Sequence, residues 1–350
     1  MAFRPKISTD RPYRDLCKMI EGRVDLERRE GMQQSGDKQI GFEDWALAQR
    51  TRPNEVLEKI AVLVDFSEAE RRLEATYSEL GRPGHRAAVL LRVMLLQHLY
   101  GLSDPQAEAQ LGDRLSFQKF VGLRADEAVP DETTICRFRQ RMIAANLHER
   151  LLEMLNEQLA SAGYLVKRTM LVDATLVESS RTRPDRESAR SGTAPDGDAR
   201  YAKKHGKSYY GYKAHISADG DNQLVCRALL TRSTVDDSKV FGELIEGKPR
   251  AVYADRIYDS LRNKAFLRAR GSANGIMKKG GNHIVVSAAD TARNRRKNRR
   301  RRNIERIFGH WKRCQGYRIV RYIGLVKNQL ELTLKAVTYN LRRLVSLVTA

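Results

Sequence analysis

Two short apolar segments, each holding a single aspartate, constrain the fold of this chain most strongly. Residues 170–177 read Met-Leu-Val-Asp-Ala-Thr-Leu-Val and contain Asp173, and residues 251–255 read Ala-Val-Tyr-Ala-Asp and end at Asp255. Such runs are typical of buried strands in a parallel or mixed sheet, where a carboxylate is costly unless it lies at a strand end and binds a ligand. The two segments therefore predict a sheet core that presents two functional acids.

A third acid, Glu305, lies within the very basic segment 299–313. Apolar residues recur there at helical spacing, so one face of an amphipathic helix would pack while the arginines face outward. Arg301, Glu305, Phe308 and Lys312 follow an i, i+4, i+7, i+11 pattern and would lie along nearly one line. The simpler alternative is an exposed Glu–Arg pair of little energetic value.

Two strand-end aspartates and a helix glutamate can converge on a pair of divalent cations. Such sites hold their ions about 3.5–4 Å apart and stabilise both the attacking and the leaving oxygen of an in-line phosphoryl displacement. Magnesium prefers a few carboxylates together with water and substrate phosphates, which fits three acids without a histidine cluster.

The charge of the chain predicts a polyanionic partner. Lysine and arginine number 64 against 43 acids, giving a formal charge of +21 and a pI near 10.0. No apolar stretch is long enough to span a bilayer and the N-terminus has no signal-peptide core, so nucleic acid is favoured over a membrane and a cytoplasmic location is expected. Four scattered cysteines without CxxC spacing indicate a reducing compartment and argue against structural zinc.

Several short segments that include the three acids occur in a fixed order. They are residues 81–83 (Gly-Arg-Pro), 99–104 (Leu-Tyr-Gly-Leu-Ser-Asp), 129–134 (Val-Pro-Asp-Glu-Thr-Thr), 172–175 (Val-Asp-Ala-Thr), 210–216 (Tyr-Gly-Tyr-Lys-Ala-His-Ile), 253–255 (Tyr-Ala-Asp) and 304–309 (Ile-Glu-Arg-Ile-Phe-Gly). In this order they resemble the bacterial DDE transposases of the insertion-sequence-five type. The resemblance spans roughly residues 80 to 345.

The resemblance implies a fold and a site. It implies an α/β protein: an RNase H-like catalytic domain over 166–350, with a mixed five-stranded sheet flanked by helices. An all-α, helix-turn-helix-like DNA-binding region over 81–165 would precede it, and residues 1–80 form a helical region to which no role is assigned. In the family, three acids bind the catalytic Mg²⁺, for which Mn²⁺ substitutes; here they are Asp173, Asp255 and Glu305.

The family often carries a tyrosine, an arginine, the glutamate and a lysine along its last catalytic helix. Arg301 and Lys312 match this pattern and would contact DNA, whereas Asn298 stands at the tyrosine position. This departure concerns a supporting DNA contact and leaves the metal site untouched. Lys213, in the Tyr-Gly-Tyr-Lys segment, is a further DNA-binding candidate.

Residues 131–141 form a second candidate DNA contact, on a helix that Asp131 would cap. Its apolar side chains would face the core, and threonines and arginines on the other face would reach phosphates or, for the arginines, guanines. The alternative is a solvated basic face on a structural helix. The candidate contacts are Thr133, Thr134, Arg137 and Arg141.

The polar stretch 179–207 reads as a long mobile loop, which either orders on DNA through Lys203 and Lys204 or is solvated without a role.

The basic run 293–302 would hold a DNA strand beside the acids or act as a solvated charge run. Asp236 and Asp237 are rival carboxylates, more simply explained as caps of a helix over 238–245. Other expected elements are helices over 42–50, 54–78, 85–100, 104–111, 146–162, 263–270 and 327–348, a hairpin of 207–218 with 222–231, and a strand at 275–278.

The function predicted from these features is DNA transposition. The protein would bind the terminal inverted repeats of its element and catalyse metal-dependent strand cleavage and transfer, with element ends and target DNA as partners. A homodimer or larger synaptic complex in a bacterial, nucleoid-associated setting is implied by the resemblance. Two alternatives remain: a non-catalytic DNA-binding regulator derived from a transposase, and an RNase H-like nuclease that cuts without joining.

Overall fold

The computed structural model describes residues 54–77, 84–124, 126–204, 206–280 and 285–349. The helix expected over 42–50 lies outside these ranges. The helix expected over 54–78 is two helices, α3 (Glu55–Leu63) and α4 (Ser67–Glu74). The chain breaks between them because Gln158 bonds to both the amide and the carbonyl of Asp65.

The helical region is built around one helix that is buried on all sides. This helix, α5, ends at Gly101, whose φ of +72° is the left-handed conformation that glycine tolerates, and Ser103 then caps the next helix with a reciprocal bond to Gln106. The expected helices are therefore confirmed, with one further short helix between them. The region comprises α5 (Ala87–Tyr100), α6 (Asp104–Asp113), α7 (Leu115–Val121), α8 (Glu132–Ala144) and α9 (Leu147–Ser161).

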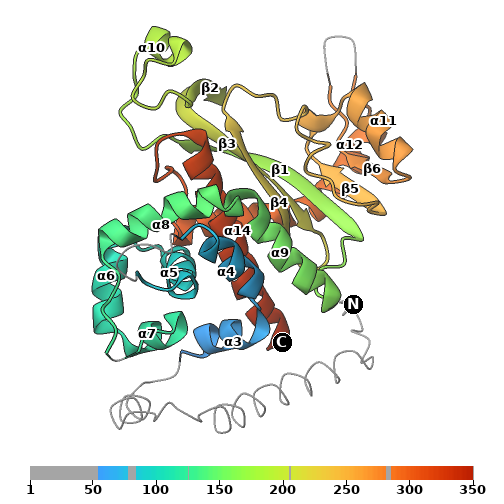
Figure 1. Cartoon of the computed structure of the whole chain (residues 1–350). Coiled ribbons are helices and arrows are strands. Elements are labelled where there is room, and N and C mark those ends of the chain that lie inside the picture. Colours follow the sequence, from blue (N-terminus) through green and yellow to red (C-terminus); the bar gives the residue numbers. More distant parts are fainter. Residues whose placement is uncertain (1–53, 78–83, 125, 205, 281–284, 350) are drawn as a thin grey trace.

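The sheet confirms the expected α/β class (Figure 1). Five strands follow the order β4-β3-β1-β5-β6, with antiparallel pairing from β4 to β1 and parallel pairing from β1 to β6. A sixth, unexpected strand, β2, pairs with the beginning of β3. The strands are β1 (Thr169–Glu178), β2 (Arg200–Lys204), β3 (Lys207–Asp219), β4 (Val225–Arg232), β5 (Ala251–Ala254) and β6 (Ala273–Ile276).

The segment 179–207 is not the structureless loop that its composition suggested. It contains helix α10 (Arg186–Ser191) and strand β2. The buried carboxylate of Asp196 anchors it by accepting hydrogen bonds from the hydroxyls of Ser179 and Tyr212. The order of this segment thus comes from tertiary contacts, which composition does not reveal.

The helix predicted over 238–245 is absent, and the chain there follows a series of turns. The Asp236 side chain accepts from the amide of Ser238, and Lys213 donates to the carbonyl of Val235. The bond from Ser238 to Asp236 is one that a helix cap makes, but a cap alone does not sustain a helix unless further turns propagate it. The prediction of a helix here was therefore wrong.

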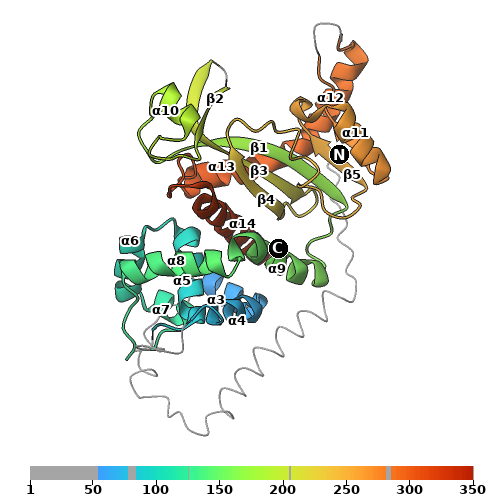
Figure 2. The same ribbon diagram turned by 45° about the horizontal axis from the view of Figure 1, so that its top comes forward.

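Three helices complete the chain. The basic amphipathic segment is divided between α12 (Ala288–Arg301) and α13 (Asn303–Cys314), which meet at Arg302, so the single helix expected over 299–313 is wrong. The long α14 (Leu325–Val348) confirms the expected last helix and lies between the helical region and the sheet (Figure 2). Short α11 (Leu261–Ala269), capped by Ser260, precedes β6.

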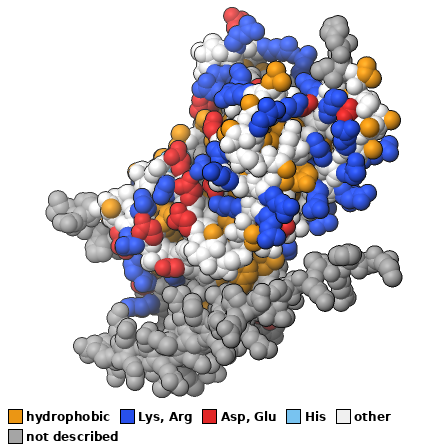
Figure 3. Space-filling model, turned by 90° about the vertical axis from the view of Figure 1, so that its right-hand side faces the viewer, with side chains coloured by type: hydrophobic (Ala, Val, Ile, Leu, Met, Phe, Trp, Pro, Cys, Tyr) orange, Lys and Arg blue, Asp and Glu red, His pale blue; other side chains and the backbone are white. Residues whose placement is uncertain are grey.

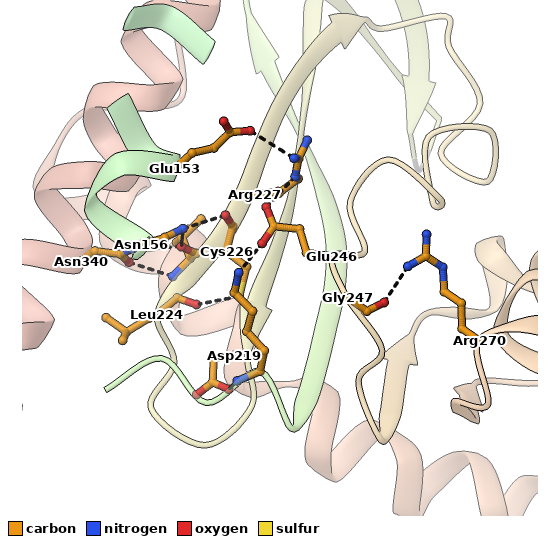
Figure 4. A network of polar contacts seen from close by, with 12 residues as sticks. Glu153, Asn156, Asp219, Leu224, Cys226, Arg227, Glu246, Gly247, Arg270 and Asn340 are labelled. Atoms are coloured by element: carbon orange, nitrogen blue, oxygen red, sulfur yellow. Dashed lines mark hydrogen bonds and ion pairs between the residues drawn. The ribbon is translucent and has the colours of Figure 1, made fainter. Parts of the chain in front are cut away.

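A buried polar network joins the helical region to the sheet (Figure 4). Asn156 of α9 donates to the carbonyls of Val225 and Cys226, and Asn340 of α14 accepts from the amide of Val225. Arg227 then binds Glu153 at 3.1 Å and Glu246 at 2.7 Å. The beginning of β4 is thereby held at a defined position against α9 and α14. No helix in the described parts of the chain is long and apolar enough to cross a membrane.

Candidate active site

The two strand aspartates are neighbours. Strand β1 pairs with β5 in parallel register, with Val172 opposite Ala254, so Asp173 and Asp255 occupy the next position on adjacent strands. Adjacent strands lie about 4.8 Å apart, and side chains at paired positions point to the same face. Asp255 also caps a short 3₁₀ turn by accepting from the amide of Arg256 at 2.7 Å. The sheet therefore brings together two of the three predicted acids.

Arg301 brings the third acid to the same place. Its guanidinium donates to Oδ2 of Asp173 at 2.6 Å and to Oε1 of Glu305 at 2.7 Å. The Arg301 side chain is 11% exposed, whereas that of Glu305 is 52% exposed. The exposed Glu–Arg pair considered from sequence is thus half of a bridge that reaches the sheet.

The Asp173 carboxyl has an unusual protonation equilibrium. The pKa of this carboxyl is raised to about 6. Burial is the largest cause, and the nearby charges of Asp255 and Glu305 add to it, whereas Arg301 and the amide of Ala174 lower the pKa. A carboxyl with other carboxylates near it gains by binding a cation, because the cation offsets both desolvation and like-charge repulsion. The electrostatics of the three acids therefore favour a positive ligand.

The donor set fits a hard divalent cation, since all its atoms are carboxylate oxygens. Within the described ranges, no group of three or more metal-ligating side chains is already drawn together closely enough to bind an ion. Arg301 accounts for this, because its guanidinium lies between Asp173 and Glu305. Arg301 occupies one oxygen of Asp173 and one of Glu305, so its release from either acid would open a further position for a cation.

Lys312 lies beside these acids. Its ammonium group donates to the hydroxyl of Thr175, two residues beyond Asp173 on the same face of β1. Burial lowers the pKa of Lys312, the positive charges of Lys204 and Arg318 lower it further, and Asp173 opposes them. Lys204, predicted as a DNA contact, is therefore close enough to the site to affect its charge.

The comparisons with known proteins identify the family. A model of the transposase DDE domain matches residues 165–341, and a model of a transposase domain (DUF772) matches residues 45–141. This chain belongs to the DDE transposases of insertion sequences. Among solved structures, it is similar to a piggyBac transposase synaptic complex with hairpin DNA, with 8% identity, 86% of this chain and 75% of that chain covered, and a TM-score of 0.40. DDE transposases generally use divalent metals.

Lys213 of this transposase is held in a buried ion pair. Its side chain is 17% exposed and lies 2.9 Å from Asp237, which is 13% exposed. Burial lowers the pKa of neighbouring His215 to about 4, an effect that Asp237 opposes. The buried hydroxyl of Tyr258 has no hydrogen-bond partner among the described residues, and the nearby charges of Asp173, Asp237 and Asp255 raise its pKa further above the value that burial gives it. The sequence predicted Asp237 as a helix cap or a rival carboxylate, and it did not reveal the pair with Lys213, since no local pattern links a residue of β3 to this turn.

The candidate DNA contacts of α8 lie in the helical region of the transposase. Thr133 and Arg137 are exposed, Thr134 is half-buried, and Arg141 stacks on the ring of Tyr77 at 4.0 Å. Asp131 caps the helix as predicted, accepting from the amide of Thr134. Lys203 and Lys204 are both exposed on β2, beyond the catalytic strands.

Arg139 is a residue of α8 that sequence reasoning did not single out. Only 4% of it is exposed, and its guanidinium binds Asp104 at 2.6 Å and lies over the ring of Tyr322. It joins α8 to α6 and to the segment before α14. The arginines of α8 are therefore divided among exposed, half-buried and buried positions.

Proposed function

We propose that this chain binds the terminal inverted repeats of its insertion sequence and catalyses metal-dependent DNA strand cleavage and transfer, with Asp173, Asp255 and Glu305 as the catalytic, metal-binding acids. The observation that carries the proposal is the placement of Asp173 and Asp255 side by side on parallel strands, with Glu305 linked to Asp173 through Arg301. Membership of the DDE family supports the reaction class.

The acids would hold Mg²⁺, for which Mn²⁺ would substitute, and the bound ions would supply charge stabilisation and an activated water or 3′ hydroxyl. Asp173 is a competent ligand above about pH 6, where it is ionised. Once Arg301 is released from an acid, its planar guanidinium is suited to bidentate contact with a phosphate. Lys312 adds a second positive group on the same face of β1.

The DNA partner would extend beyond the acids. Exposed Lys203 and Lys204 would contact the backbone near the site, Thr133, Thr134, Arg137 and Arg141 would bind from α8, and Lys213 would act only if its pair with Asp237 opened. We propose residues 81–165 as the DNA-binding domain, 166–350 as the catalytic domain and 1–80 as a helical region without an assigned role. Element ends and target DNA would be held by a homodimer or larger synaptic complex in the bacterial cytoplasm.

The deciding experiment measures strand joining. Purified protein is incubated with labelled DNA carrying the ends of its own element, a target plasmid and Mg²⁺, beside Asp173→Asn, Asp255→Asn and Glu305→Gln. We expect joined product from the wild type only, with DNA binding retained by all three variants. Asp221→Asn, at an exposed hairpin turn, is the matched control and should join normally.

Two outcomes would replace the proposal with its alternatives. Tight and specific binding without cleavage, in Mg²⁺ and in Mn²⁺, would indicate a DNA-binding regulator. Cleavage that depends on the three acids but never yields joined product would indicate an RNase H-like nuclease.

A further inference from the structure

A basic pocket lies between α12 and the carboxyl end of β6. It has a volume of about 250 Å³, which exceeds the roughly 30 Å³ that one water occupies in the liquid several times over. Asn274, Ile276 and Asn294 contribute to its wall. The cations that line it are Lys264, Lys278, Lys279, Arg293 and Lys297.

Two carboxylates in the pocket already have partners. Asp259 binds the ammonium of Lys264 at 2.6 Å and accepts from the amide of Lys279 at 2.8 Å. Asp290 binds Lys278 at 2.6 Å, with Arg293 farther away at 3.9 Å. Five cations against two carboxylates leave a surplus of three positive charges, concentrated on Lys279, Arg293 and Lys297.

Lys297 is a cation of the pocket whose ammonium already has a backbone partner. Its ammonium donates to the carbonyl of Ile276 at 2.6 Å, and the side chain is half-buried. Burial lowers its pKa, Asp259 opposes this, and the like charges of Lys264 and Arg293 lower the pKa further. An anion in the pocket would offset this repulsion.

The pocket is next to the catalytic acids. The amide of Met277, just after β6, donates to the carbonyl of Ala254, and Asp255 follows Ala254 directly. The pocket therefore opens one strand away from Asp255, at the same carboxyl edge of the parallel strands, where ligands of such sheets bind. Figure 3 shows this side of the molecule, where lysine and arginine side chains dominate the surface over α11 and α12.

We propose that this pocket binds one backbone phosphate of the DNA strand that passes the acids, with Lys279 and Lys297 as its contacts. The proposal rests on the proposed function, because it takes DNA as the ligand. A free phosphate or nucleotide offers the same chemistry, so the test separates these sources.

The first measurement is the salt dependence of DNA binding, recorded by fluorescence anisotropy with a labelled nonspecific duplex in EDTA. One lost phosphate contact flattens the slope of log affinity against log salt by about 0.9. We expect this change for Lys279→Gln/Lys297→Gln and a partial change for Lys279→Gln alone. Lys279→Arg, which keeps the charge, should retain the wild-type slope.

Lys59→Gln is the matched control for Lys279→Gln, because each removes one positive charge and Lys59 lies on α3, 3.6 Å from Glu55. A double variant whose slope equals that of this control would overturn the proposal. Since EDTA prevents catalysis, the result is independent of whether the wild type joins strands. If the wild type failed to join strands but the double variant showed the flattened slope, the phosphate-binding pocket would stand and only the proposed reaction would be rejected.

The second measurement is lysine acetylation followed by mass spectrometry on the full-length wild type. DNA should protect Lys279 and Lys297 several-fold more than Lys59, and inorganic phosphate at the same phosphate concentration should not. Equal protection by inorganic phosphate with an unchanged salt slope would assign the pocket to a free anion and overturn the DNA proposal.

Discussion

Two partly buried carboxylates, each bound to an arginine, have opposite protonation behaviour in this transposase. Glu246 is 21% exposed and binds Arg227, and Asp173 is 18% exposed and binds Arg301. Burial raises the pKa of Glu246, but hydrogen bonds and charge from Lys167 and Arg227 overcome it, so its net pKa is lowered. The pKa of Asp173 is instead raised to about 6.

The difference lies in charge balance. Arg227, in the network of Figure 4, binds both Glu153 and Glu246. Each of these carboxylates has a second cationic partner, Arg150 for Glu153 and Lys167 for Glu246. At the carboxyl edge of β5, beside Asp173, a single guanidinium contacts two of three neighbouring carboxylates. A balanced network stabilises a joint between elements, whereas an unbalanced cluster of acids attracts a cation.

The largest expected effect is on strand joining, which should depend on the acids near Arg301 and not on the polar network around Glu246. Asp255→Asn should lower strand joining at least about a thousandfold, because metal-based stabilisation of several kcal/mol is lost and each 1.4 kcal/mol is a factor of ten. Its urea midpoint should stay near the wild-type value. A joining rate within tenfold of the wild type would exclude Asp255 from the catalytic set.

The complementary substitution is in the polar network that joins α9 and α14 to β4. Asn340→Ala should reduce the free energy of unfolding by about 2–4 kcal/mol, because the buried amide of Val225 and the Asn156 side chain lose their partner and a cavity forms. Urea denaturation would measure it, with exposed Gln140→Ala as the control. The folded fraction should still join DNA at a near-normal rate; a thousandfold loss of joining would contradict a purely structural role.

The third largest effect is on the pH dependence of stability, which should reflect the raised pKa of Asp173. The folded-state pKa of Asp173 is about 6 against 3.8 ordinarily, so the folded protein binds the proton more tightly and loses stability as pH rises through this window. Between pH 5 and pH 7, without metal, the wild type should lose about 1–2 kcal/mol relative to Asp173→Asn. Parallel stability curves for the two proteins would contradict the raised pKa.

The smallest effect concerns Arg301. Its removal in Arg301→Gln should tighten Mg²⁺ binding without DNA by up to about tenfold, since a unit charge some 6 Å from a divalent ion costs roughly 1 kcal/mol in a watery site. Isothermal titration calorimetry would measure the affinity, with exposed Arg300→Gln as the control. Weaker binding in Arg301→Gln would instead mean that Arg301 organises the acids for metal.

Local patterns predicted the strands that hold Asp173 and Asp255, the Asp131 cap and the last helix, because each depends on residues close together in the chain. They failed at 238–245, where the capping bond to Asp236 is not followed by a helix, and at 179–207, where Asp196 binds Tyr212 of another element. They also placed Arg301 in a helix with Glu305 without revealing its bond to Asp173, 128 positions away in the chain.

The sequence by itself determined the acids, their order and the strands that hold two of them, because apolar runs and helical spacing are local properties of the chain. Only the tertiary structure decided that Arg301 bridges Asp173 and Glu305, that Asp237 pairs with Lys213 and that Arg139 is buried. Which charge neutralises which carboxylate depends on distances across the folded protein and on desolvation, and neither is encoded in any short stretch of sequence.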